Sequence, residues 1–274
     1  MTAAVEFSWY LPCDGDGHWT STAEPEREPT LAYLEQVAVA AERAGFDSVL
    51  VPVAFSSSNY SPWSPRADAI LAATSALRAT DRVRVILAHR PGFVNAGVFA
   101  MIAAQLDRAS GGRLALNIVT AGAAGDMEQF GDELDHDTRY ARAEEFVDAV
   151  QLLWSQHTSD FDGRFVKLRA ARLEPKPHQP GGPPIYLAGA SESALRMAAR
   201  QADVYMMSAE TVDGVAKRIA DLRARGAAWA LATLLRRGDD VRARERRRGT
   251  RVGPRIRRAR RSRGARGAAA RRPC

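Results

Sequence analysis

Short apolar runs alternate with amphipathic helical patterns along most of this 274-residue chain, and this alternation constrains the fold more than any other feature. The first four apolar runs lie at residues 7–12, 46–52, 83–88 and 113–120. After each run comes a segment with the apolar spacing of a helix, at 30–45, 64–80, 97–112 and 138–156, respectively. The second of these helices is expected to begin near Pro65. We therefore expect strands that are each followed by a helix.

The pattern is interrupted after the fourth apolar run and then resumes. A Gly/Ala-rich loop precedes the long helix at 138–156, and residues 160–175 predict a small hairpin with a turn at Asp162-Gly163. Strands are again expected at 183–190 and 203–208, with helices at 192–201 and 212–226.

Apolar strands that alternate with helices are typical of a parallel sheet buried on both faces. A doubly wound sheet and a TIM (β/α)8 barrel both fit this order. No G-x-G-x-x-G follows the first strand, which weakens the dinucleotide-binding version of the former. About six βα units before Gly226 favour an α/β fold of the TIM (β/α)8-barrel type. No run of 18 apolar residues predicts a membrane span.

The end of the chain differs sharply in composition. Residues 227–274 hold 17 arginines and 3 acids, whereas residues 1–226 hold 22 basic and 29 acidic side chains. A helix is conceivable up to Leu235, but β-branched and aromatic residues nearly vanish beyond it. We therefore expect an incomplete barrel domain over 1–226, without strands seven and eight, and a disordered tail over 227–274.

Two origins of the tail are compatible with its composition. It resembles a nucleic-acid-binding basic segment, but no aromatic residues are interleaved through its last part for base stacking. A reading-frame shift in GC-rich DNA would also yield Arg, Gly, Ala and Pro, and we favour this explanation over nucleic acid as a partner. Cys13 and Cys274 lie at opposite ends and no signal peptide is evident, so we expect no disulfide and a cytoplasmic protein.

Functional residues of a parallel barrel lie where strands end and loops begin. The polar and small residues at these ends are Asp14, Asp16, His18, Val53, Ser56, Ser57, Ser58, His89, Arg90, Asn117, Val119, Thr120, Ala190 and Ser191. The loop at Asp14 lacks the glycine and glutamate that a calcium-binding EF-hand requires. The chain has neither H-E-x-x-H nor paired C-x-x-C, so no metal site is predicted.

Two of these segments suit an anion. The small residues before Ser191 leave N–H groups free at a helix start, which favours a phosphate; the alternative is a plain turn with Ser191 as the N-cap. His136 and Tyr140 are four residues apart and can share a helix face toward a ligand; the alternative is a helix start capped by Asp137.

Seven segments in order resemble the bacterial luciferase-like, flavin-dependent monooxygenases, and within them the alkanesulfonate monooxygenase branch. They are WYLPCDGDGHW, ERAGFDSVLVP, HRPG, LDRASGGRLALNIVTAG, LDHDTRYARAEEF, FDGRFVKLRAARL and PPIYLAGASESA. The resemblance implies a TIM barrel that uses reduced FMN and O₂ to cleave the C–S bond of a sulfonate or related organosulfur compound, giving an aldehyde and sulfite. It also implies a separate NAD(P)H:FMN reductase as partner, and a homo-oligomer for an intact chain.

The resemblance further implies roles for individual residues. Val53, Asn117, Val119 and Thr120 would border the flavin, while His136, Tyr140, Ala190 and Ser191 would bind its phosphate side. His89 and Arg90 would lie near the flavin ring as catalytic residues. Ser57 stands where the branch usually has a cysteine, and would be catalytic in its place. Asp14 and His18 would form the substrate side, with Asp14 replacing a more usual histidine.

Besides the serine at position 57, two departures leave other functions open. An acid at position 14 would repel an anionic sulfonate unless it is paired, and the branch's later arginine, histidine and tyrosine positions have no counterpart here. We therefore expect this chain to be poorly stable or inactive, although intact relatives are enzymes. A deazaflavin (F420)-dependent oxidoreductase of the same superfamily is one alternative. A non-catalytic protein with a nucleic-acid-binding tail is the other.

Overall fold

The computed structural model describes residues 6–18, 24–57, 59–120, 122, 125–208, 210–226 and 230–234. Its strands are β1 (Ser8–Tyr10), β2 (Ser48–Val51), β3 (Arg84–His89), β4 (Leu114–Ile118), β5 (Ser159–Asp162), β6 (Lys167–Ala171), β7 (Ile185–Ala188), β8 (Val204–Ser208) and β9 (Ala230–Leu234). Its helices are α1 (Leu31–Arg43), α2 (Ala69–Ala79), α3 (Ala96–Ala109), α4 (His136–Ser155), α5 (Glu192–Gln201) and α6 (Val212–Ala224), with a 3-10 turn η1 (Glu128–Phe130).

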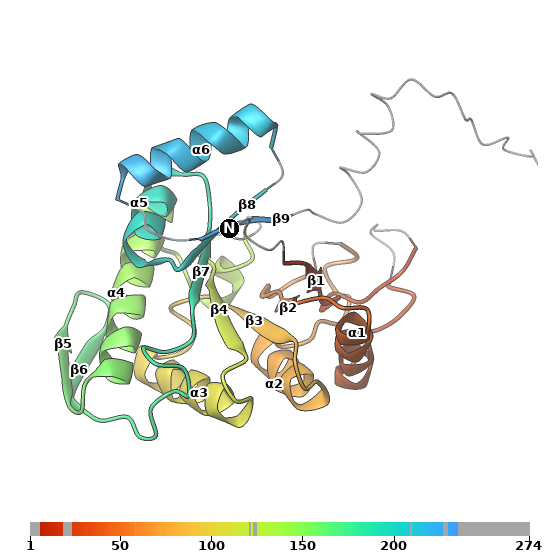
Figure 1. The fold of residues 1–274 in the computed structure, drawn as a ribbon, viewed down its shortest axis with the longest axis horizontal. Helices are drawn as coiled ribbons and strands as arrows, with labels where there is room; N and C mark the ends of the chain where they lie inside the picture. The colour runs from red at the N-terminus through yellow and green to blue at the C-terminus, as the bar shows by residue number, and fades with distance from the viewer. Residues whose placement is uncertain are drawn as a thin grey trace, which may run out of the picture. The chain divides into compact units, whose positions relative to one another are not determined.

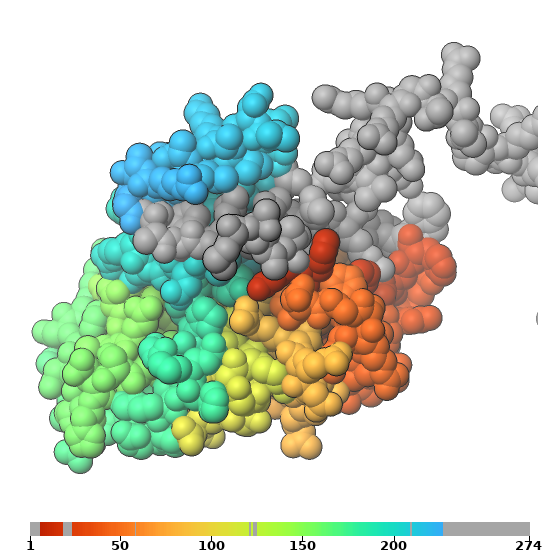
Figure 2. Space-filling model, in the orientation of Figure 1, coloured from red at the N-terminus to blue at the C-terminus, as the bar shows by residue number. Residues whose placement is uncertain are grey.

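The main sheet is parallel throughout and curls in the manner of a partial barrel (Figure 1). Its strand order is β1-β2-β3-β4-β7-β8-β9, so each strand pairs with the next one along the chain except across the β5–β6 hairpin. Six strands are each followed by a helix, which confirms the prediction of an incomplete TIM-type barrel with six βα units. Successive units lie side by side, and the colour accordingly passes from orange through yellow to green in sequence order (Figure 2).

The two faces of the sheet carry separate apolar clusters, because side chains alternate between faces along a strand. The outer cluster joins the sheet to the helices; Val49, Leu87 and Leu116 belong to it. The inner cluster contains Leu50, Ile86, Ala115, Tyr186 and Met206. The inner face is the one that a barrel encloses, so polar residues on it are candidates for ligand contact.

Two expected elements differ from those observed. Residues 230–234 form β9, which pairs in parallel with β8, rather than the conceivable helix up to Leu235. The compact unit of the structure runs to Leu234, and the domain boundary expected at Gly226 stays a prediction. The second helix begins at Ala69 rather than near Pro65, because the Asp68 side chain accepts a hydrogen bond from the Leu71 N–H and caps the helix there.

The remainder of the predicted tail, with Cys274, lies outside the described residues. The other cysteine, Cys13, is a buried thiol, and burial raises its pKa to about 12. Within the described ranges, no helix combines the length and the apolar character needed to cross a membrane.

Candidate active site

The carboxyl ends of the parallel strands meet at one edge of the sheet, here called the mouth. The loops after β2, β3 and β4 are tied together there by Asp126. Its carboxylate pairs with the Arg90 guanidinium and accepts hydrogen bonds from the backbone N–H groups of Phe55 (3.1 Å) and Ser56 (2.8 Å). Burial alone would raise the pKa of Asp126, but the hydrogen bonds from Arg90 and Ser56 outweigh it and hold this pKa below its usual value.

Arg90 is packed as well as paired. Its guanidinium lies over the Phe55 ring, 4.9 Å from the ring centroid, and only 4% of its side chain is exposed. A Cβ on Gly122 would approach Arg90 Nη2 to 2.5 Å, so glycine is needed where the loop after β4 passes the guanidinium. Arg90 lies at the mouth, where its charge is compensated by Asp126, and its catalytic role stays a prediction.

A second buried ion pair joins the loop after β1 to the segment before α2. The Asp14 carboxylate pairs with the Arg66 guanidinium and accepts a hydrogen bond from Asn59 Nδ2 at 2.8 Å. Arg66 Nη1 also donates to the Ser56 carbonyl at 3.3 Å, which connects this pair to the loop held by Asp126. The acid at position 14 is therefore paired with a cation, so its negative charge is compensated.

Asn117 is the polar residue that β4 places on the inner face. It lies two residues after Ala115 of the inner cluster and pairs in register with Ala88 and Tyr186. Its Oδ1 atom is buried and accepts no hydrogen bond from the described residues. A buried carbonyl oxygen that accepts no hydrogen bond destabilises the folded state. A ligand N–H at this position would supply the missing hydrogen bond.

The other residues predicted to border the flavin have different surroundings. Thr120 is buried and Val119 is half-buried, and both directly follow β4. Val53 packs against the outer cluster and not with the inner one that contains Ala115. Ser57 is buried in the loop after β2, where its Oγ accepts a hydrogen bond from the Tyr60 N–H at 3.1 Å.

The His89 ring faces the helices rather than the mouth, and its catalytic role stays a prediction that this placement does not favour. Its ring stacks on Phe99 of α3, with centroids 3.8 Å apart, and on Phe146 of α4 at 5.3 Å. It therefore lies on the helix side of the sheet. Burial lowers its pKa to about 3, so the ring is neutral at physiological pH. We assign His89 to packing between the sheet and two helices.

His18 also lies apart from the other candidate residues. Its side chain is 81% exposed, and Nδ1 pairs with Glu26 at 2.7 Å across the loop after β1. That hydrogen bond lowers the pKa of Glu26. The structure thus brings Asp14 into the mouth, whereas its neighbour His18 lies at the surface.

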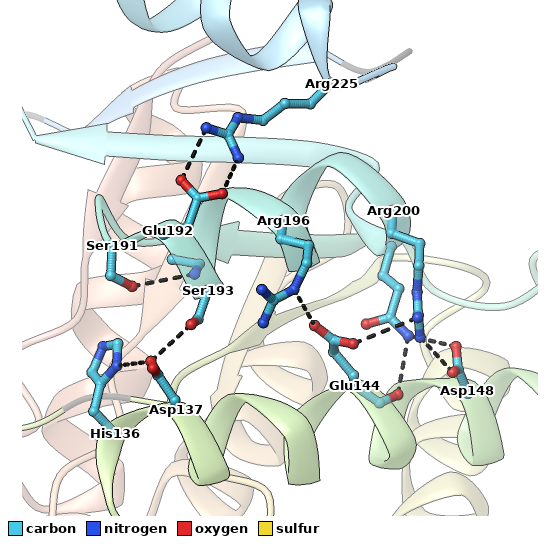
Figure 3. A network of polar contacts seen from close by, with 12 residues as sticks. His136, Asp137, Glu144, Asp148, Ser191, Glu192, Ser193, Arg196, Arg200 and Arg225 are labelled. Atoms are coloured by element: carbon cyan, nitrogen blue, oxygen red, sulfur yellow. Dashed lines mark hydrogen bonds and ion pairs between the residues drawn. The ribbon is translucent and has the colours of Figure 1, made fainter.

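The turn between β7 and α5 forms a second polar centre at the same edge (Figure 3). Gly189 has φ +138°, and its carbonyl accepts a hydrogen bond from the Tyr205 hydroxyl. A Cβ at this glycine would lie 2.8 Å from the Tyr140 hydroxyl, so Tyr140 closely approaches the turn. Ser191 caps α5 by accepting the Ala194 N–H at 3.2 Å, which confirms the capping alternative without excluding a ligand.

The start of α4 lies against the start of α5. Ser193 Oγ donates to Asp137 at 2.8 Å, and His136 Nδ1 lies 2.8 Å from the same carboxylate oxygen (Figure 3). The hydrogen bonds from His136 and Ser193 lower the pKa of Asp137. Asp137 is not the helix cap, because Asp135 accepts the Thr138 N–H instead. His136, Tyr140 and Ser191 thus lie near one turn, and their binding of a phosphate stays a prediction.

An ionic network on the outer surface holds these helices in place (Figure 3). Arg200 of α5 pairs with Asp148 of α4 at 2.7 Å, and Arg225 after α6 is hydrogen-bonded to Glu192 of α5 at 3.0 Å. A surface cavity of about 380 Å³ lies beside Arg196, Arg200 and Arg225. Its lining comes from α5 and the end of α6, so it does not belong to the mouth.

The sequence reasoning missed Arg66 and Asp126. Both lie in loops whose apolar patterning is too weak to predict their conformation, although both follow strands at the mouth. A signal was present, since each is a charged residue between a strand and the next helix. Among the described residues, no group of three His, Cys, Asp or Glu side chains could hold a metal.

Comparison with known proteins gives the family and the fold. The family model described as luciferase-like monooxygenase matches residues 5–259. Among solved structures, a riboflavin lyase with modified FMN and riboflavin superposes with a TM-score of 0.73 at 21% identity, over 85% of this chain and 62% of that one. The EDTA monooxygenase of Chelativorans sp. BNC1 gives 0.70 at 22% identity, over 84% and 63%.

A third structure shares the fold: an F420-dependent secondary alcohol dehydrogenase with an F420-acetone adduct superposes with a TM-score of 0.67 at 18% identity, over 83% of this chain and 68% of that one. The chain spans less than two thirds of the length of the riboflavin lyase and of the EDTA monooxygenase.

Proposed function

The chain belongs to the luciferase-like monooxygenase family, and from this premise we propose that it is the oxygenase component of a two-component, FMN-dependent monooxygenase. The observation that carries the proposal is the arrangement of two polar centres on one edge of the sheet. Asn117 offers an unsatisfied acceptor on the inner face, and the turn before Ser191 offers helix-start N–H groups.

In this proposal the two centres would hold the two ends of reduced FMN. The orphaned Asn117 Oδ1 would accept a ring N–H, with Val119 and Thr120 beside it. Ala190, Ser191, His136 and Tyr140 would bind the phosphate, which is favoured by the N-terminal end of the α5 dipole. Asp137 is a negatively charged neighbour of this phosphate site. Its carboxylate is hydrogen-bonded to His136 and Ser193, which offset part of that charge.

Reduced FMN, when bound, supplies the two electrons with which O₂ delivers one oxygen atom to the substrate and the other to water. The protein's own contribution is position and charge. Ser57 and Arg90 lie in loops at the mouth, where the Ser57 hydroxyl and the Arg90 Nε–H, which Asp126 does not use, would donate hydrogen bonds to negative charge developing on oxygen. The two buried ion pairs connect the loops after β1, β2, β3 and β4, which favours exclusion of water.

We propose an organosulfur compound as substrate, following the alkanesulfonate branch that the motifs resemble. An alkanesulfonate R–CH₂–SO₃⁻ with FMNH₂ and O₂ would give the aldehyde R–CHO, sulfite, FMN, water and a proton. An NAD(P)H:FMN reductase would supply FMNH₂. We further propose cytoplasmic location, and association of an intact chain with itself.

The test supplies the purified chain with NADH, FMN and an NADH:FMN reductase, then measures sulfite and aldehyde from a panel of organosulfur compounds. Product that requires the chain, the reductase and O₂ together supports the proposal and overturns the expectation that a chain without strands seven and eight is inactive. A folded chain that yields no product from any member of the panel, although the reductase delivers FMNH₂, contradicts it.

The fold shared with the F420-dependent alcohol dehydrogenase supports a second candidate, a deazaflavin-dependent oxidoreductase. The two candidates differ in the reduced cofactor that the mouth prefers. Anaerobic spectral titration with FMNH₂ and with reduced F420 separates them: tight binding of reduced F420 alone would replace the first proposal with the second.

A further inference from the structure

The ion pair between Asp14 and Arg66 lies where a substrate would enter. Asp14 follows β1, and Arg66 precedes the helix that follows β2, so both lie at the mouth. Their side chains are 8% and 10% exposed, respectively. The Asn59 amide donates to the second Asp14 oxygen at 2.8 Å, so the carboxylate is held from two sides.

Two arginines that the structure describes in this region are neutralised by carboxylates. Arg66 is paired with Asp14, and Arg90 is paired with Asp126. The two pairs are linked through Ser56, whose carbonyl accepts from Arg66 and whose N–H donates to Asp126. An anionic substrate group would find compensated charge here rather than a free guanidinium.

We propose that Asp14 acts as a charge selector, so that this chain takes an uncharged organosulfur substrate of the sulfide, sulfoxide or sulfone class in preference to an anionic sulfonate. The proposal rests on the proposed function for the existence of an organosulfur site. It adds the substrate's charge class and assigns the selection to one residue that the catalytic chemistry does not use.

Electrostatics gives the direction of the preference. A sulfonate could bind Arg66 only by displacing Asp14, and a buried carboxylate left without its cation is strongly unfavourable. If it bound beside the intact pair, the sulfonate would lose its hydration next to a neutral pair that offers no net attraction in return. An uncharged sulfone meets neither cost, since its oxygens need only hydrogen-bond donors.

Two small probes differ almost solely in charge. Dimethyl sulfone and methanesulfonate are both tetrahedral at sulfur, and one methyl group of the former is an anionic oxygen in the latter. Their binding to the full chain is measured by calorimetry, with and without anaerobic FMNH₂. Wild type is compared with Asp14→Asn, which keeps the shape of the side chain and frees Arg66.

Asp16→Asn is the matched control. Asp16 lies two residues away in the same loop, and its carboxylate accepts a hydrogen bond from the Tyr33 hydroxyl at 2.8 Å. The control therefore makes the same chemical change without releasing Arg66. The double variant Asp14→Asn/Arg66→Gln tests whether Arg66 is the group that is freed.

Wild type is expected to bind dimethyl sulfone and to discriminate against methanesulfonate. Asp14→Asn should bind methanesulfonate more tightly by about tenfold or more, since a hydrogen-bonded charge is gained. Asp16→Asn should leave both affinities unchanged, and the double variant should lose the gain. Equal affinities in wild type, no binding of either probe, or no gain in a folded Asp14→Asn would overturn the proposal.

The wild-type comparison requires no variant, so it decides the matter even where Asp14→Asn fails to fold. The flavin titration separates the two levels of inference. Charge discrimination by a chain that does not bind FMNH₂ leaves the selector in place and rejects the monooxygenase proposal. If the chain binds FMNH₂ but binds the two probes with equal affinity, the monooxygenase proposal stands and the charge-selector proposal is rejected.

Discussion

His89 and Arg90 are adjacent in the sequence and lie in opposite environments. The pleat of β3 turns His89 toward the helices, where Phe99 and Phe146 enclose its ring, whereas Arg90 leaves the strand and pairs with Asp126. A sequence pattern could place both at a strand end. It could not tell which one faces the mouth, because a shift of one residue in strand register exchanges the two faces.

His89 predicts a pH dependence of folding stability. Its pKa in the folded protein is about 3, below the ordinary 6.5, so only the unfolded chain takes up a proton as the pH falls below 6.5. Stability from this group is complete above that pH and decreases toward pH 3. We expect His89 to lower the free energy of unfolding by about 2 kcal/mol between pH 7.5 and pH 5.

Urea unfolding of wild type and His89→Leu at both pH values measures this effect. In His89→Leu the free energy of unfolding should change less between the two pH values, because the His89 contribution is removed. The control His157→Gln, at an exposed position, should keep the wild-type change. An equal slope in wild type and His89→Leu would contradict the buried, neutral assignment.

Asp126 carries a larger stability prediction. Its replacement by Asn leaves the Arg90 guanidinium buried without a counter-charge and weakens the acceptor for Phe55 and Ser56. We expect Asp126→Asn to lower the free energy of unfolding by about 3 kcal/mol, as for other broken buried pairs. Asp162→Asn, which changes an exposed pair on the hairpin, should cost much less in the same assay. Similar losses in both variants would show that the Arg90 pair is not buried in solution.

Side-chain caps account for where the elements begin. Each of the six helices has an N-cap side chain that accepts a backbone N–H; the caps are Thr30, Asp68, Asn95, Asp135, Ser191 and Thr211. The apolar periodicity could predict each helix, since it reflects one buried face. It could not choose between Asp135 and Asp137 as a cap, because that choice depends on the local turn of the chain.

The caps of α5 and α6 provide a matched pair for a test at this scale. Ser191→Ala and Thr211→Ala each remove one cap hydrogen bond, of 3.2 and 3.1 Å. Each should lower the free energy of unfolding by about 1 kcal/mol. Chemical denaturation measures both, and a Ser191→Ala loss near zero would mean that Ser191 does not cap α5 in solution.

At the scale of the whole molecule, the alternation of strands and helices predicted the parallel sheet and its curl, since a strand-to-strand crossover through a helix requires parallel pairing. The strand β9 could not be predicted, because residues 230–234 carry apolar and helix-favouring residues that gain strand structure only by pairing with β8. The candidate site was predicted in part: its strand ends were located, but the pairing of charges across separate loops is a property of the fold.

The strand β9 yields a prediction about the length of the folded unit. A chain ending at Leu234 retains the partner of β8, whereas one ending at Gly226 leaves that strand as an open edge. We expect the shorter chain to have the lower free energy of unfolding and a greater tendency to aggregate. Denaturation and light scattering of both chains measure this. Equal values would mean that β9 contributes nothing to the folded unit.

The most direct measurement of the central claim is an anaerobic titration of the full chain with FMNH₂, followed by absorbance and fluorescence. Wild type should bind saturably, one flavin per chain. Ser191→Ala should bind it more weakly by about tenfold, and Thr211→Ala, with the same type of cap removed from α6, should bind it as wild type does. No saturable binding by folded wild type, or equal affinity in all three proteins, would contradict the flavin site proposed at the mouth.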